Sequence, residues 1–143
     1  MKILVINGQN INMLGIREPG IYGSESDEDL CGMINGYAAE CGIDAEIYQS
    51  NHEGCLIDKI QEAYGNTDGI VINPGGYTHT SVALLDALKA VSIPAVEVHI
   101  SEVDKREAFR QISYVREACI ETVTGLGIAG YVEAIKILQR ELS

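Results

Sequence analysis

Basic residues are scarce in this chain of 143 residues. Ten Lys and Arg residues stand against 21 Asp and Glu residues, which gives a net charge of −11. Twelve of the carboxylates lie within residues 18–68, where Lys59 is the single cation. So acidic a chain is poorly suited to bind nucleic acid or an anionic membrane surface, and we expect neither partner. Any anion-binding site should draw its cations from residues 1–17 and 69–143.

Long apolar runs, tryptophan and paired cysteines are also missing. No stretch of about 18 apolar residues predicts a transmembrane helix. The short apolar run after Lys2 has neither the length nor the cleavage site of a secretory signal. Phe109 is the single Phe, so the core must consist mainly of Ile, Val, Leu and Ala. The four cysteines show no Cys-x-x-Cys spacing, which predicts reduced thiols, no zinc site and a cytoplasmic location.

The sequence does contain alternating strand and helix patterns, and 46% hydrophobic residues suit one domain over residues 1–143. Apolar runs predict strands at residues 2–8, 43–49, 68–73, 95–100 and roughly 118–123. Periodic apolar residues predict helices at residues 26–42, 54–64, 80–90, 104–111 and 127–142. This order favours an α/β fold, a flavodoxin-like three-layer sandwich with a five-stranded parallel sheet in the order 2-1-3-4-5. The half-polar strand at residues 43–49 is expected at an edge.

Ligands of such a sheet bind beyond the carboxyl ends of the strands, close to the switch point between strands 1 and 3. Polar residues gather at these places, in the loops at residues 9–23 and 73–81 and at residues 97–101. Two of the three histidines, His79 and His99, belong to this set. The residues alone leave structural roles open. His99 can be a packed histidine at a strand end, and the loop polar groups can simply satisfy the backbone.

Four spaced motifs occupy these segments. They are Asn-Gly-x-Asn-x-Asn-x-Leu-Gly-x-Arg-x-Pro-x-x-Tyr-Gly at 7–23, Gln-Ser-Asn-His-Glu-Gly at 49–54, Asn-Pro-Gly-x-Tyr-Thr-His-Thr-Ser at 73–81 and Glu-Val-His-Ile-Ser at 97–101. Together they resemble type II 3-dehydroquinate dehydratase over nearly the whole chain. That family converts 3-dehydroquinate to 3-dehydroshikimate by trans-dehydration through an enolate. The resemblance implies a hydro-lyase without metal or organic cofactor, and it leaves shikimate biosynthesis and quinate breakdown both open.

The resemblance also implies catalytic roles. Tyr22 matches the proton acceptor and Arg17 the cation that stabilises its phenolate and the transition state. His99 matches the proton donor to the leaving hydroxyl. Glu97 lies on the same strand face two residues earlier and is expected to orient the imidazole. Asn10 matches the group that stabilises the enolate. Without the resemblance, Tyr22 would be interpreted as an aromatic loop residue that covers apolar surface, and Arg17 as a solvent-exposed charge.

Further positions match the substrate-binding set, and these are Asn73, His79, Ile100, Ser101 and Arg110. Ser101 and the backbone at Ile100 are expected to bind the carboxylate of 3-dehydroquinate, and the other three its ring hydroxyls. Arg106 matches a residue near a mobile lid loop at about residues 17–25. Asp86 aligns with an aspartate that reaches into the neighbouring subunit's site. The resemblance therefore implies a homo-oligomer, a dodecamer of four trimers.

Some positions depart from the family pattern. Gln9 stands where Pro is usual, Leu85 where Arg is usual, and Glu102 and Asp104 where Asn and His are common. These departures bear on a turn, on the subunit contact and on lid closure, and none falls on a predicted catalytic residue.

Two other functions fit the same topology. A flavodoxin-like domain that binds a small ligand without catalysis is the main alternative, but the first loop has no Ser/Thr-rich phosphate cradle. A signalling receiver domain would need an acceptor Asp at the strand ends, where this chain carries Asn7 and Asn73. His52 follows the second strand and is interpreted as structural.

Overall fold

The structure is a computed structural model that describes residues 1–16 and 18–143, apart from the side chain of Asp104. Five parallel strands form one sheet in the predicted order, β2-β1-β3-β4-β5. The strands are β1 (Lys2–Asn7), β2 (Asp44–Gln49), β3 (Gly69–Asn73), β4 (Ala95–His99) and β5 (Glu121–Thr124). β1, β3 and β4 are central and almost wholly buried, as in parallel sheets covered on both faces. β2 is the half-exposed edge strand that its alternating sequence predicts.

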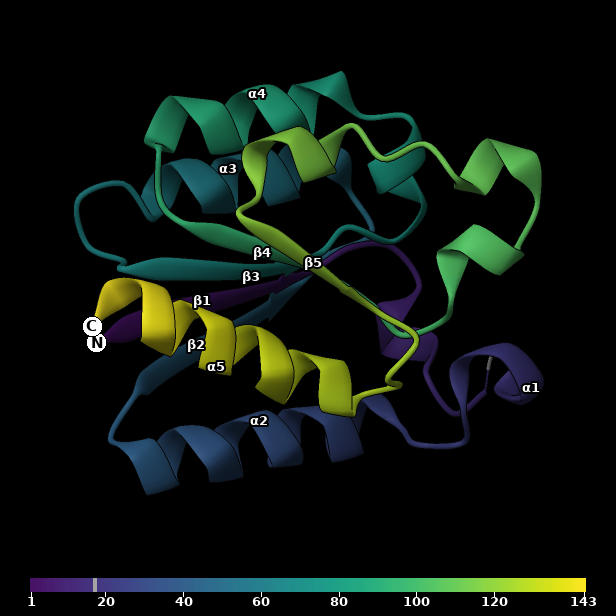
Figure 1. Cartoon of the computed structure of the whole chain (residues 1–143), viewed down its shortest axis with the longest axis horizontal. Helices are drawn as coiled ribbons and strands as arrows, with labels where there is room; N and C mark the ends of the chain where they lie inside the picture. Colours follow the sequence, from purple (N-terminus) through teal and green to yellow (C-terminus); the bar gives the residue numbers. More distant parts are fainter. Residues whose placement is uncertain (17) are drawn as a thin grey trace.

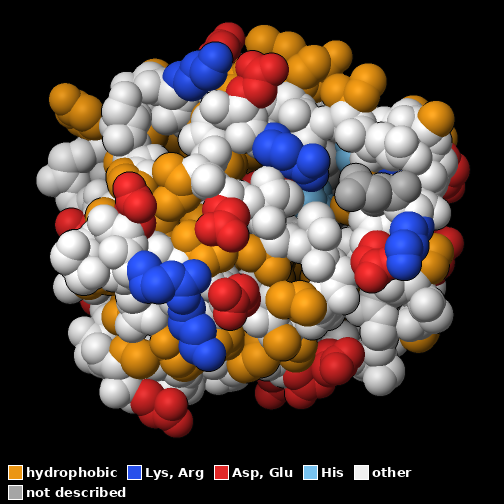
Figure 2. Space-filling model, in the orientation of Figure 1, with side chains coloured by type: hydrophobic (Ala, Val, Ile, Leu, Met, Phe, Trp, Pro, Cys, Tyr) orange, Lys and Arg blue, Asp and Glu red, His pale blue; other side chains and the backbone are white. Residues whose placement is uncertain are grey.

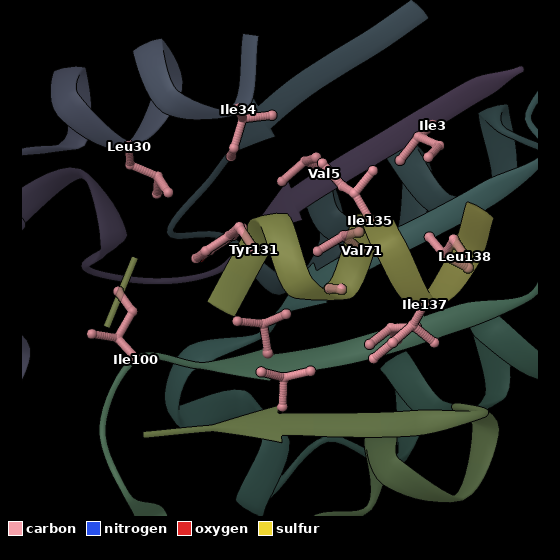
Figure 3. Close-up of a cluster of buried hydrophobic side chains, with 14 of the residues drawn as sticks. Ile3, Val5, Leu30, Ile34, Val71, Ile100, Tyr131, Ile135, Ile137 and Leu138 are labelled. Carbon is pink, nitrogen blue, oxygen red and sulfur yellow. The ribbon is translucent and has the colours of Figure 1, made fainter. Parts of the chain in front are cut away.

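Helices cover both faces of the sheet and complete three layers (Figure 1). The long helices are α2 (Asp27–Cys41), α3 (Glu53–Glu62), α4 (Val82–Val91) and α5 (Ala129–Leu142). α2 and α5 lie on one face, and α3 and α4 lie on the other (Figure 1). Because successive strand residues point to opposite faces, β1 contributes Ile3 and Val5 to one core and Leu4 and Ile6 to the other. Figure 3 shows the first of these cores, between the sheet and the α2–α5 layer.

The helix α2 begins as its sequence predicts. The Ser26 hydroxyl accepts a hydrogen bond from the Asp29 amide at 3.1 Å, and the Asp29 carboxylate accepts one from the Ser26 amide at 3.0 Å. This reciprocal cap and the acidic first turn both stabilise a helix start. Glu28 and Asp29 are exposed, and Figure 2 shows acidic side chains along the side of the molecule where α2 lies. The acidic helix thus faces outward in the single chain.

The carboxyl ends of the central strands lead into loops at one end of the molecule, opposite the two termini (Figure 1). Gly8 lies where the loops after β1 and β3 meet. Its amide donates to the Asn73 carbonyl at 2.7 Å, and a Cβ atom on Gly8 would collide with the Pro74 carbonyl. Glycine at this position therefore lets the two loops approach each other.

Several predicted boundaries are wrong. Residues 104–111 form two 3-10 segments, η3 (Val103–Lys105) and η4 (Ala108–Arg110), in place of one helix. Phe109 is the one large apolar side chain of that stretch and is 65% exposed, so a continuous helix would have little apolar surface to bury. The last strand begins at Glu121 instead of residue 118, because Val115–Ala118 form a further 3-10 segment, η5.

The first loop is also more structured than expected. Residues 9–23 contain η1 (Ile11–Met13) and the single-turn helix α1 (Pro19–Tyr22). α1 falls within the segment predicted to be a lid, and Arg17 lies outside the described residues. In the part of the chain that the structure describes, no helix has the length and apolarity needed to cross a membrane.

Candidate active site

His99 and Glu97 form a buried pair at the end of β4. Two residues apart on one strand, their side chains share a face, as the sequence predicts. The Nε2 atom of His99 lies 2.8 Å from the Oε2 atom of Glu97. Glu97 is fully buried and His99 is 6% exposed. A carboxylate at this distance accepts a hydrogen bond from the imidazole and holds the ring in one orientation.

The carboxylate of Glu97 is itself held by side chains from three other segments. Oε2 accepts hydrogen bonds from the hydroxyls of Thr78 at 2.5 Å and Ser113 at 2.6 Å. Oε1 accepts hydrogen bonds from Arg116 Nε at 3.0 Å and the Thr122 hydroxyl at 3.1 Å. Burial alone raises the pKa of Glu97, but the donors outweigh it and hold the pKa well below its ordinary value. Glu97 is therefore an anion at neutral pH, in contact with His99.

His79 reaches the same place from the segment after β3. Its Nδ1 atom lies 2.7 Å from the Ile112 carbonyl oxygen, so Nδ1 carries a proton and donates it. Partial burial lowers the pKa of His79, although the bond to Ile112 acts in the opposite direction. In the neutral ring that this favours, Nε2 has a lone pair with which to accept a hydrogen bond from a ligand hydroxyl.

Tyr22 approaches the histidines from α1. Its hydroxyl accepts a hydrogen bond from Arg106 Nη1 at 2.7 Å, and the Arg106 guanidinium lies 5.2 Å from the centre of the Tyr22 ring. Arg106 follows η3, so the contact joins segments that are 84 residues apart. A guanidinium at hydrogen-bond distance stabilises negative charge on a phenol oxygen.

These groups surround a small cavity of about 40 Å³ at the carboxyl edge of the sheet. The predicted site residues in its lining are Tyr22, Asn73, His79, His99, Ile100, Ser101, Arg106 and Arg110. A separate open groove of about 910 Å³ lies outside it, and the two share the lining residues Tyr22, Ile100, Ser101, Arg106 and Arg110. The Tyr22–Arg106 contact therefore stands between the inner cavity and the groove. In Figure 2, pale-blue histidine atoms are visible in a hollow next to a basic side chain.

The cations of this edge come from outside the acidic block, as expected. Arg110 Nε donates to Glu107 Oε2 at 2.8 Å, and Arg110 lines both the cavity and the groove. A cavity with a phenol, two imidazoles and two guanidiniums can remove one proton, deliver another and bind an anion. Within residues 1–16 and 18–143, no group of three or more His, Cys, Asp or Glu is placed to hold a metal ion.

Comparison with known proteins decides the family. The family model for dehydroquinase class II matches residues 1–139. The chain belongs to the class II dehydroquinase family. A 3-dehydroquinate dehydratase of Clostridium acetobutylicum is 53% identical over 143 residues, which cover 100% of this chain and 99% of that protein. A catabolic 3-dehydroquinase of Aspergillus oryzae is 52% identical over 94% of this chain and 88% of its own length.

A solved structure agrees with this family assignment. The crystal structure of a type II dehydroquinase from Butyrivibrio crossotus superposes with a TM-score of 0.96 at 59% identity, covering 97% of both chains. The class II dehydroquinase fold, with its strand order 2-1-3-4-5, is thus confirmed for this chain.

Three of the predicted site residues do not line this cavity, and a fourth, Arg17, is outside the described residues. Glu97 is behind His99. Asn10 is exposed in a left-handed conformation with φ of 68°, and its backbone amide donates to Asn51 Oδ1 at 2.9 Å. Asp86 is exposed on α4 and does not line the cavity of its own chain.

The departures from the family pattern have local consequences. The Gln9 carboxamide lies against the glycine pair after β3, where a Cβ atom on Gly75 would come within 2.6 Å of Gln9 Oε1. Glu102 is paired with Lys105 at 2.7 Å and lies against Gly125. Leu85 is buried at 7% exposure.

Sequence reasoning missed the segment at residues 112–116. Ile112 holds His79 through its carbonyl, while Ser113 and Arg116 hold Glu97. The Tyr114 amide also donates to the Thr78 carbonyl at 2.8 Å. One signal in the sequence could have pointed to Arg116. Glu97 lies in a strand predicted to be buried, and a buried carboxylate needs a cation nearby. Arg116 is one of the cations that follow Glu97 in the sequence.

Proposed function

We propose that this chain catalyses the dehydration of 3-dehydroquinate to 3-dehydroshikimate, the reaction for which its family and relatives are named. One observation carries the proposal. Tyr22 and His99 line the same cavity, and each has its own charged partner, Arg106 for the phenol and Glu97 for the imidazole. A base and an acid held at one cavity are what the elimination of water requires.

Proton removal is assigned to Tyr22. Its phenolate oxygen takes the proton from the carbon next to the ketone, and the electron pair of the broken C–H bond forms an enolate. Arg106 supports this step because its guanidinium is at hydrogen-bond distance from the phenol oxygen. The family motif predicts two further roles. Arg17 would be a second cation that stabilises the Tyr22 phenolate, and Asn10 would stabilise the enolate.

Departure of water is assigned to His99. The enolate collapses to form the C=C bond while the C–O bond to the β-hydroxyl breaks. The imidazolium of His99 gives that oxygen a proton, so the hydroxyl leaves as water. The Glu97 anion supports this role, because its hydrogen bond with Nε2 keeps the ring oriented throughout the step.

Substrate binding is assigned to the remaining lining residues. Ser101 and the Ile100 backbone would hold the carboxylate, while Asn73, His79 and Arg110 would hold the ring hydroxyls. The neutral form of His79 suits this, because it can accept from a hydroxyl through Nε2. Arg110 can donate to a ring hydroxyl while Nε stays bound to Glu107, because its guanidinium has further N–H donors.

The assembly and the location are finer parts of the same proposal. We infer a dodecamer of four trimers in which Asp86 of one chain completes a neighbour's site, which its exposed position on α4 permits. We also infer a cytoplasmic location from the four free cysteines. Shikimate biosynthesis is the proposed pathway, with quinate breakdown, as in the catabolic relative's name, the second candidate.

The test is an absorbance assay, because 3-dehydroshikimate is an enone that absorbs in the ultraviolet. Purified wild-type protein with dehydroquinate and a metal chelator should give a steady rise in absorbance. Tyr22→Phe should lose at least about a hundredfold of kcat, since it removes the general base. Tyr64→Phe is the matched control, because Tyr64 is 71% exposed outside the cavity and its variant should keep wild-type turnover.

Two results would contradict the proposal. Wild-type protein that binds dehydroquinate without any rise in absorbance would favour the alternative, a flavodoxin-like binding domain without catalysis. Equal rates for wild type and Tyr22→Phe would leave the reaction standing but remove the assigned base.

A further inference from the structure

Tyr131 is a buried polar group that the mechanism does not use. It lies in the first turn of α5, is 0% exposed, and packs in the core between α2, α5 and the sheet. Figure 3 shows its side chain projecting from α5 toward the end of this core where Leu30 and Ile100 lie. That is the end next to the cavity, since Ile100 also lines it.

The Tyr131 hydroxyl bridges the carboxyl ends of two central strands. Its oxygen lies 2.7 Å from Asn7 Oδ1 and 2.8 Å from Asn73 Nδ2. Asn7 and Asn73 are register partners in β1 and β3, so their side chains share one face of the sheet. Asn73 lines the cavity, whereas Tyr131 and Asn7 do not.

The donors and acceptors around Asn73 set the direction of these hydrogen bonds. The Gly75 amide donates to Asn73 Oδ1 at 3.1 Å, which fixes the oxygen side of the Asn73 amide. Nδ2 must then face the Tyr131 hydroxyl and donate to it. The hydroxyl therefore has to donate its own proton onward to Asn7 Oδ1. Burial raises the pKa of Tyr131, so that proton stays in place.

One hydrogen of Asn73 Nδ2 and one lone pair of Oδ1 are left over in this arrangement. Their directions are set by the two bonds already made. A flip of the amide would put Nδ2 against the Gly75 amide, which is a donor facing a donor. The Tyr131 bond opposes that flip and also limits rotation of the side chain.

We propose that Tyr131 is a positioning residue for substrate binding, whose hydroxyl orients the Asn73 amide toward a hydroxyl of the bound ring through the chain Asn7–Tyr131–Asn73. The inference rests on the proposed function only for the identity of the ligand. Tyr131 would thus contribute to the affinity for the ligand although it lies in the core and does not line the cavity.

The test is Tyr131→Phe, which keeps the ring in the core and removes the oxygen. KM for dehydroquinate should rise about tenfold, because Asn73 loses its orientation and a bond to the ligand weakens in the ground and transition states alike. For the same reason kcat should stay within about threefold of wild type. Rates are measured well below the melting temperature of each variant, so that a loss of stability does not enter.

A matched control removes the same atom from the same helix layer. The Tyr37 hydroxyl donates to Gln139 Oε1 at 2.8 Å between α2 and α5, and neither residue lines the cavity. Tyr37→Phe should leave both KM and kcat unchanged. Asn7→Ala should instead raise KM, because the Tyr131 proton loses its acceptor and can turn toward Asn73.

A double-mutant cycle separates positioning from a purely structural tie. Tyr131→Phe should raise KM in the wild-type background but add nothing in an Asn73→Ala background. A KM within twofold of wild type for Tyr131→Phe, or equal effects in both backgrounds, would overturn the inference. If the wild-type protein has no turnover, the proposed function fails, and the same cycle is then read from calorimetric dissociation constants for dehydroquinate.

Discussion

Arg106 and Tyr22 meet across the mouth of the inner cavity, with Nη1 of the guanidinium 2.7 Å from the phenol oxygen. The sequence motif directed attention to Arg17 as the partner of Tyr22 and gave Arg106 only a possible lid contact. The structure makes Arg106 a direct partner of the phenol. Charge stabilisation at Tyr22 is therefore tied to the segment after η3, far along the chain.

Replacement of Arg106 should slow the chemical step. Arg106→Met removes the charge and the hydrogen bond while keeping much of the apolar stem, and kcat should fall about 10- to 100-fold, or roughly 1.4–2.7 kcal/mol of transition-state stabilisation. Steady-state rates on dehydroquinate measure this. Arg140→Met is the control, because Arg140 is an exposed residue of α5. An unchanged kcat for Arg106→Met would show that the contact with the phenol is not used in catalysis.

Glu97→Gln should lower stability and change its pH dependence. The amide would present two hydrogens to a pocket of donors, which costs about 1–3 kcal/mol of unfolding free energy at neutral pH. Because the folded-state pKa of Glu97 lies below its ordinary value of 4.5, the carboxylate stabilises the fold above that pH. That stabilisation is lost as the pH falls through and below 4.5. The unfolding free energy of the Gln variant should therefore decrease less than that of the wild type over the same pH range.

Urea unfolding of wild type and Glu97→Gln at pH 7 and at pH 4 and below measures the effect. The gap between the two curves should narrow as the pH falls. Glu133→Gln serves as the control, since Glu133 is 41% exposed and makes only a 3.8 Å contact with Arg140. A gap that is constant over this range would mean that the charge of Glu97 does not contribute to stability.

Gly8→Ala should destabilise the protein by roughly 1–3 kcal/mol, because the added methyl group collides with the Pro74 backbone rather than with a flexible side chain. Activity should fall as well, since the loops after β1 and β3 would move apart. Gly36→Ala tests the same chemical change where space is open. This glycine is exposed within α2, and its replacement should stabilise the helix by about 0.5–1 kcal/mol. Chemical denaturation of both variants measures their unfolding free energies. A Gly8→Ala variant as stable as the wild type would contradict the steric argument.

Cysteine labelling should distinguish the exposed thiols of Cys41 and Cys55 from the thiol of Cys119. Cys41 and Cys55 are exposed, whereas burial raises the pKa of Cys119 to about 12 and its thiol donates to the Val115 carbonyl. Since the thiolate is the reactive form, an alkylating reagent at pH 8 should modify the two exposed cysteines first and Cys119 only on unfolding. Peptide mass mapping over time measures the order. Rapid modification of Cys119 in the folded protein would be the contrary result.

The sheet was predictable because its determinants are local. The buried runs of β1, β3 and β4 and the alternating pattern of β2 each lie in one short stretch of sequence, and their positions follow from burial. The capping residues Ser26 and Asp29 mark the start of α2 in the same way. For the helix predicted at residues 104–111, polar composition gave no such signal, and two 3-10 segments formed instead.

The site was predictable only in part. Tyr22, His79 and His99 were predicted because the motifs place them in the loops after β1 and β3 and at the end of β4, and the structure brings all three to one cavity. Their supports come from segments that are distant in the sequence: Arg106 for Tyr22 and Ser113 for Glu97. These contacts depend on the path that the loops and 3-10 segments take over the edge of the sheet. The hydrophobic periodicity of a single helix or strand does not predict that path.

The inner cavity has room for a few water molecules while Tyr22 and Arg106 are in contact. We expect a ring-sized ligand to displace this water, and to open the Tyr22–Arg106 contact where it enters from the groove. Entry and release of the ligand would then be gating steps, and their rates would not depend on how strong an acid or base the site presents.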